Sequence, residues 1–106
     1  GNKLVPGTTV IQMEATVDEL INSTGDTLKR VRKELTTEPG AYFLVHCGGR
    51  KLGIGNRLEE VHKQLVKEAK GVPFICIFTF GEYGYREHSA NTCGGLMLSF
   101  TGFGKE

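Results

Sequence analysis

The sequence predicts a single α/β domain of the α+β type, in which two helices pack against a mixed four-stranded sheet. Hydrophobic residues make up 39% and charged residues 24% of the 106 positions, proportions typical of one soluble globular domain. Continuous apolar runs at 41–45 and 74–78 alternate with amphipathic segments of helical period, and turns rich in glycine and proline separate them. We therefore expect residues 1–106 to form one domain with the element order strand, helix, strand, helix, strand, strand.

The first two predicted elements lie in the N-terminal third of the chain. A proline–glycine turn precedes Thr9–Met13, a β-branched and apolar stretch that predicts a strand. Thr16 and Glu19 then have the spacing of a capping box, which predicts the start of a helix. Apolar residues follow at spacings of three and four as far as Leu35, and Gly25 lies in the long gap of this pattern, where we expect any kink or break.

A buried central strand is predicted over Ala41–Cys47, because a continuous apolar run is typical of a strand covered on both faces. The connection 48–55 that follows is rich in glycine, so its backbone can approach a ligand or another segment closely. Asn56 and Glu59 form a second capping pair, and an amphipathic helix is expected over Leu58–Ala69.

The last two strands are predicted at Phe74–Phe80, another continuous apolar run, and at Leu96–Phe103, which alternates like a strand with one exposed face. A polar loop over 81–93 separates them. We expect the first three strands to be parallel through right-handed crossovers and the last strand to run in reverse. Such a sheet has open edges, and we expect something outside the chain to cover one of them.

Charge and cysteine usage exclude several function classes. Thirteen basic and twelve acidic residues give a net charge of +1, so no overall field attracts nucleic acid or a membrane surface, and the apolar runs are too short to span a bilayer. Cys47, Cys76 and Cys93 show neither a disulfide framework nor a metal-site spacing. They favour a reducing, cytoplasmic location, with Cys76 as a small buried side chain in its strand.

The glycine-rich connection carries the first candidate binding residues. Gly48, Gly49 and Arg50 lie between a strand and a helix but lack the spacing of a nucleotide-binding loop. A guanidinium beside glycine amides suits a carboxylate or another small anion, and a structural ion pair of Arg50 is an equal alternative. Gly81 and Glu82 end the next apolar strand, where open sheets usually bind ligands, and a single carboxylate favours binding over acid–base catalysis.

Catalytic and metal sites have weaker support in the sequence. Cys47 or Cys93 would need an adjacent base to act as a nucleophile, and His46 points to the opposite face of its strand from Cys47. His46, His62 and His88 share no metal-ligand spacing with the cysteines. We therefore expect no enzyme activity, no catalytic residues and no bound metal.

With these segments in place, the sequence resembles the C-terminal domain of FIST proteins. The resemblance runs from Pro6 to Phe100 and is carried by His46–Arg50, ahead of a capped helix, and by Val72–Tyr83. The positions that match the family pattern are Cys47, Arg50, Gly81, Glu82 and, less closely, Asn91. The sequence departs from that pattern at Cys76, where glycine is common, and at Tyr83, where an aliphatic residue is common.

The resemblance implies an intracellular sensory domain that binds a small ligand, such as an amino acid, for signal transduction. It also implies a partner, either an N-terminal FIST domain or a signalling domain. The expected ligand-binding residues are Cys47, Gly48, Gly49, Arg50, Gly81, Glu82 and Asn91. In this hypothesis Arg50 pairs with a ligand carboxylate and Glu82 with an ammonium, which requires both side chains to lie around one hollow.

Two other functions are alternatives at this point. An exposed sheet edge suits a protein-interaction or scaffold module, or one that forms a homo-oligomer. Some FIST proteins are linked to haem and nitric oxide, and the same resemblance therefore also implies a haem sensor that uses His46, His62 or His88.

Overall fold

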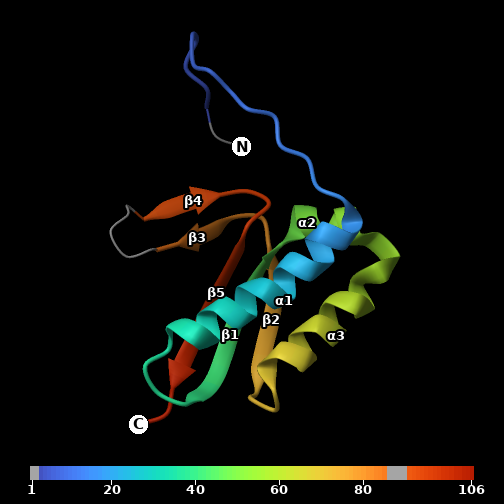
Figure 1. Ribbon diagram of the computed structural model, residues 1–106. Coiled ribbons are helices and arrows are strands. Elements are labelled where there is room, and N and C mark those ends of the chain that lie inside the picture. The colour runs from blue at the N-terminus through green and yellow to red at the C-terminus, as the bar shows by residue number, and fades with distance from the viewer. Residues whose placement is uncertain (1–2, 86–90) are drawn as a thin grey trace.

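The computed structural model describes residues 3–85 and 91–106 and confirms the α/β class with a mixed sheet (Figure 1). The helices are α1 (Val17–Glu34), α2 (Gly48–Ile54) and α3 (Leu58–Ala69), with a 3₁₀ turn η1 (Gly55–Arg57) between the last two. The strands are β1 (Pro39–Cys47), β2 (Phe74–Thr79), β3 (Glu82–Gly84), β4 (Thr92–Gly94) and β5 (Leu98–Gly104). The long helices α1 and α3 lie together on one face of the main sheet.

The main sheet has three strands in the order β2-β1-β5, so the run predicted as the central strand does lie in the centre. β1 is parallel to β2 and antiparallel to β5, and Leu44 is opposite Cys76 on one side and Phe100 on the other. The parallel pair and the reversed last strand were both expected from the sequence. β3 and β4 form a separate antiparallel hairpin.

The core lies between the sheet and the two long helices. Alternate residues of β1, namely Tyr42, Leu44 and His46, are buried on the helix side, as the two-residue period of a strand requires. The helices contribute their apolar stripes, Ile21 and Leu28 from α1 and Val61, Leu65 and Ala69 from α3.

The opposite face of the sheet differs from the prediction of strands covered on both sides. Phe43 of β1, Ile75 of β2 and Phe103 of β5 are exposed there, by 38%, 57% and 54%. No helix among the described residues packs on this face (Figure 1), so these apolar side chains remain in contact with solvent.

Helix α1 begins with the predicted capping box. The Glu19 amide donates to Thr16 Oγ1 over 3.2 Å, and the Thr16 amide donates to Glu19 Oε2 over 2.7 Å. The helix runs without a break through Gly25, although the sequence allowed a kink or a break there. A Cβ atom on Gly25 would lie 3.0 Å from Gln64 Oε1, so the glycine instead allows α3 to approach α1 closely.

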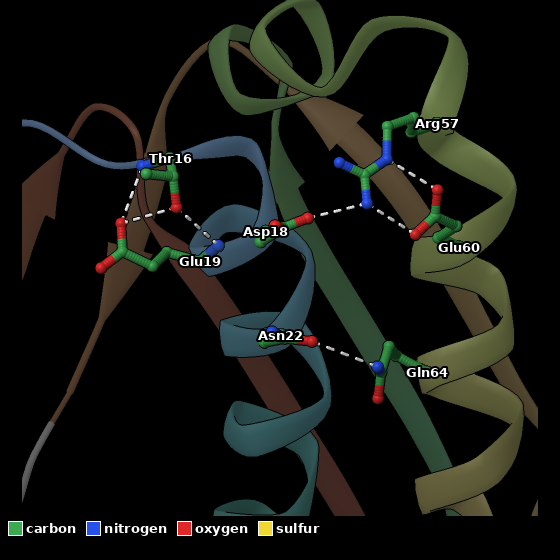
Figure 2. A network of polar contacts seen from close by, with 7 residues as sticks. All are labelled: Thr16, Asp18, Glu19, Asn22, Arg57, Glu60 and Gln64. Carbon is green, nitrogen blue, oxygen red and sulfur yellow. Dashed lines mark hydrogen bonds and ion pairs between the residues drawn. The ribbon is translucent and has the colours of Figure 1, made fainter.

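Polar contacts tie the first turns of α1 to the start of α3 (Figure 2). Arg57, which directly precedes α3, bonds to Asp18 over 2.8 Å and to both carboxylate oxygens of Glu60. Two turns further along α3, Gln64 donates to Asn22 over 3.3 Å. Asn56 is not the cap of α3 that the sequence suggested, because η1 runs directly into the helix.

The prediction of a fourth strand in the sheet is wrong. Thr9–Met13 belongs to an N-terminal arm, residues 3–15, that joins no sheet and runs away from the body of the domain (Figure 1). Its side chains are exposed, Ile11 by 81% and Met13 by 83%. The turn predicted at Pro6–Gly7 does form, with the Thr8 amide donating to the Val5 carbonyl. The arm has no strand edge beside it, which is why its β-forming residues stay unpaired.

None of the helices in the described residues is long and apolar enough to cross a membrane.

Candidate functional site

The candidate site lies at the end of the sheet where β1 and β2 both finish. The two strands are parallel and in register there, with Cys47 opposite Thr79. The residues that follow each strand, 48–50 and 80–82, are therefore brought to one edge, as the sequence led us to expect.

Cys47 sits at the junction of three segments. Its Sγ accepts a hydrogen bond from the Gly49 amide over 3.3 Å and one from the Leu96 amide over 3.2 Å. The thiol thus caps α2 and also fixes the residues just before β5. Leu96 has a left-handed backbone with φ of 59°, a conformation that costs a non-glycine residue about 1–2 kcal/mol.

Arg50 lies one turn into α2 and points toward α1 rather than into solvent. One terminal nitrogen donates to the Leu20 carbonyl over 2.8 Å and to Ser23 Oγ over 2.6 Å. Burial lowers the pKa of the guanidinium, and the nearby Cys47 sulfur opposes that effect. Within the described residues Nε of Arg50 is buried without a hydrogen-bond partner.

His46 is fully buried and holds one tautomer. Nδ1 lies 3.2 Å from the Cys47 carbonyl, which can only accept, so Nδ1 carries the proton. Nε2 then faces Thr24 Oγ1 at 3.4 Å as an acceptor, in competition with the Leu20 carbonyl, which accepts from the same hydroxyl over 3.1 Å. Burial lowers the pKa of His46, the bond to Cys47 raises it, Arg50 lowers it and Glu82 raises it. The ring is therefore neutral, and Arg50 and Glu82 both lie within electrostatic range of it.

Glu82 is the first residue of β3 and is fully buried. Thr79 Oγ1 lies 2.9 Å from Oε1 and donates to it, with the Gly81 carbonyl as a second acceptor at 3.2 Å. Among the described residues Oε2 is buried and has no partner. Taking a carboxylate out of water with one hydroxyl donor is costly, so this position is unusual for a purely structural residue.

These three side chains, His46, Arg50 and Glu82, form what we call the polar cluster. In the described residues no ion pair joins Arg50 to Glu82, and each retains an unbonded polar atom. A group that donates to the carboxylate and accepts from the guanidinium would satisfy both atoms.

The glycines of the predicted site contribute differently from the expectation. Residues 48–54 form helix α2 instead of an open loop. The Cys47 side chain caps its first turn, and neighbouring segments pack against it. A Cβ on Gly48 would lie 3.0 Å from the Phe80 ring, and one on Gly49 would lie 2.8 Å from Leu96. The space beside each glycine is thus occupied by another side chain of the same chain.

Gly81 and Asn91 have contrasting positions. Gly81 directly precedes Glu82 and has open space around its Cα. Asn91 is exposed and precedes β4, beyond the outer end of the hairpin, while Glu82 pairs with Gly94 at the inner end. Nothing in the described structure brings Asn91 to the polar cluster.

Two grooves lie away from the polar cluster. An apolar groove of about 340 Å³ runs between α3 and β2, past His62 and Phe74. A larger groove of about 1290 Å³ lies between α1, β5 and the hairpin. Neither groove is lined by Cys47, Arg50 or Glu82, and these three side chains are buried.

Of the candidate haem ligands, His46 lies in the core and His62 lies on the surface of α3. His46 has both ring nitrogens engaged and no exposed surface, and His62 borders only the smaller groove. His88 lies outside the described residues. Within those residues no three histidine, cysteine or acidic side chains converge in the manner of a metal site.

The residues that support the cluster were not predicted from the sequence. Ser23, Thr24 and Thr79 each place a hydroxyl against Arg50, His46 or Glu82. One signal was present: Ser23 and Thr24 are polar residues followed directly by Gly25 in the middle of an amphipathic helix.

The sequence matches the FIST C domain over residues 1–85. The match ends within the hairpin, so β4 and β5 lie beyond it. No curated protein and no solved structure matches the chain. With the match covering most of its length, the chain belongs to the FIST C domain family, a family of sensory-signalling domains that are typically non-catalytic.

Proposed function

We propose that this chain is a sensory domain whose polar cluster binds a small ligand carrying both a carboxylate and an ammonium group, of which a free amino acid is the simplest case. The carboxylate accepts from Arg50, and the ammonium donates to Glu82. The observation that carries the proposal is the pair of buried, unbonded atoms, Arg50 Nε and Glu82 Oε2. Each ionised hydrogen bond supplied by the ligand is worth about 1.5–3 kcal/mol.

Entry of a ligand requires movement of the segments that close the cluster. The inner end of the hairpin and the Leu96 segment lie over it, held by the bond from the Leu96 amide to Cys47 and by the strained backbone at Leu96. Opening these segments for a ligand would shift the hairpin relative to β1. Ligand binding is thereby coupled to a change in shape, which a sensory domain needs.

The experiment is a calorimetric titration of the chain with a panel of free amino acids. We expect at least one to bind, and its dissociation constant to rise at least about tenfold in Arg50→Lys and in Glu82→Gln. Lys67→Gln and Glu59→Gln are the controls, because they remove an exposed cation and an exposed carboxylate on α3, away from the cluster. Far-ultraviolet circular dichroism verifies that each variant is folded.

Absence of binding by the whole panel would refute the amino-acid hypothesis. Binding that is unchanged in folded Arg50→Lys and Glu82→Gln variants would show that the ligand occupies another site.

A further inference from the structure

The N-terminal arm, residues 3–15, contains a strand-forming sequence that pairs with no strand of the described chain. Thr9–Met13 has β-branched and apolar side chains, and every described residue of the arm is exposed. Such a segment gains nothing from solvent exposure, since the burial of each large apolar side chain is favourable. Its sequence therefore points to a partner surface.

The free edge of β5 is a surface of matching form. β5 forms one edge of the sheet, and among the described residues of the hairpin Tyr83 contacts the start of that edge, where Ser99 Oγ donates to its carbonyl. Beyond this point lies the larger groove described above, of about 1290 Å³, which we call the β5 groove. Val31 and Leu35 of α1 form one wall, Phe100 and Thr101 lie on β5, and Cys93 belongs to the hairpin wall.

The arm and the β5 groove lie on different sides of α1. The start of α1, to which the arm is attached, lies at α2, where Arg50 bonds to the Leu20 carbonyl. The groove contacts only the C-terminal half of α1, from Thr27 onward, about 16 Å along the helix from Thr16. Glu14 and Ala15, the link between Met13 and the helix cap, span at most about 11 Å. A second copy can supply the strand without that restriction.

The exposed surface of the chain is also large enough for a stable dimer interface. The chain exposes 7955 Å², whereas a compact monomer of its mass exposes about 5,800 Å². Its radius of gyration is 15.0 Å, against about 13 Å for a compact domain of this length. The excess of about 2,100 Å² is more than twice the area that each partner buries in a stable interface of standard size.

We propose that two copies of this chain exchange their arms, with Thr9–Met13 of each copy adding as a strand to the free edge of β5 in the other. Every second residue of an added strand faces the helices, so Ile11 and Met13 share one face and pack against Val31, Leu35 and Phe100. The exchange is reciprocal, as a two-fold dimer requires. It covers the open edge of β5 with a strand from the other copy.

Sedimentation equilibrium of the full chain tests the proposal through Ile11→Asp/Met13→Asp. Both positions are exposed, so the double substitution leaves the folded core intact. We expect the parent chain to dimerise and the dissociation constant of the dimer to rise about a hundredfold in the double variant. Leu52→Asp is the control, because Leu52 is 76% exposed on α2 and should leave the dimer unchanged.

Thiol labelling read by mass spectrometry of the Cys93 peptide locates the arm. Cys93 is exposed in the single chain and borders the β5 groove, so we expect slow labelling in the dimer and fast labelling in the double variant. A chain that stays monomeric at all concentrations overturns the proposal. This holds also for a monomer in which Cys93 is labelled slowly because the arm covers the groove of its own chain. A dimer that survives Ile11→Asp/Met13→Asp, or one whose loss leaves Cys93 labelling unchanged, also overturns it.

Discussion

His46 shows how much of the candidate site depends on single side chains that the fold places out of contact with water. Its ring has no exposed surface, and its Nδ1–H group donates a hydrogen bond to the Cys47 carbonyl. Its neighbours Arg50 and Glu82 have opposite effects on its pKa. Burial is the largest of these effects and keeps the imidazole neutral.

This burial makes the stability of the domain depend on pH. An unfolded histidine takes up a proton below about pH 6.5, whereas the lowered pKa of His46 keeps the folded ring unprotonated. The unfolded state therefore binds more protons in this window, and the free energy of unfolding falls as the pH falls, by up to about 1.4 kcal/mol per pH unit. Urea denaturation at about pH 7.5 and about pH 5.5 measures the effect.

His62→Gln is the matched control for that experiment, because His62 is an exposed histidine on α3 and its loss should leave the pH dependence intact. His46→Gln, where it folds, should reduce the dependence. Equal unfolding free energies of the parent chain at the two pH values would contradict the burial of a neutral His46.

Residue by residue, the candidate site was partly predictable. Cys47, Arg50 and Glu82 all lie at the end of the sheet where β1 and β2 finish, because the two strands are parallel and in register. The direction of Arg50 was not predictable, since its partners, the Leu20 carbonyl and Ser23, belong to a helix 27 to 30 residues earlier in the chain. Short-range sequence patterns carry no information on such a contact.

At the scale of elements, the predicted and observed helices and strands agree best where the hydrophobic periodicity of the sequence is strong. Helix α3 (Leu58–Ala69) contains the apolar residues that predicted it, because its apolar stripe and its closing glycine are unambiguous, but it begins after Arg57 and not at the predicted Asn56 cap. Helix α2 was missed because its glycines lower helix propensity, and tertiary contacts outweigh that deficit. The strand predicted at Thr9–Met13 has the right residues but no neighbouring edge within the single chain.

The contact between α1 and α3 at Gly25 gives a prediction at this scale. Gly25→Leu would force its side chain against Gln64 and Glu68, and overpacking of this kind costs about 1–3 kcal/mol. In Gly25→Ala the flexible end of Gln64 has only to move aside, and the gain in helix propensity offsets that cost. We therefore expect the alanine variant to lie within about 1 kcal/mol of the parent chain in urea denaturation.

Asp26→Leu is the control for the leucine variant, because Asp26 is the next residue along the helix and is exposed. If Gly25→Leu and Asp26→Leu unfold at the same urea concentration, α1 and α3 do not approach each other at Gly25.

At the scale of the whole molecule, the domain is one-sided. Its apolar core lies between the sheet and the helices, while the other face of the sheet is open (Figure 1). Leu44 and Ile75 lie on neighbouring strands, with Leu44 fully buried on the helix side and Ile75 57% exposed on the open side. Truncation of the two side chains therefore compares the two faces directly.

We expect Leu44→Ala to lower the free energy of unfolding by about 2–5 kcal/mol, because it leaves a cavity in the core. Ile75→Ala should cost less than about 1.5 kcal/mol, since most of its side chain is already in water. Urea denaturation of both variants supplies the measurement. Similar losses in the two would mean that the open face is covered in solution.

The central position of β1 has a consequence for synthesis on the ribosome. β1 is the first strand to emerge, but β5, which pairs along nearly all of its length, is the last element of the chain. The nascent polypeptide therefore exposes one edge of β1 until β5 has left the exit tunnel. Until then β1 is paired along one edge at most, and this unpaired edge is prone to aggregation.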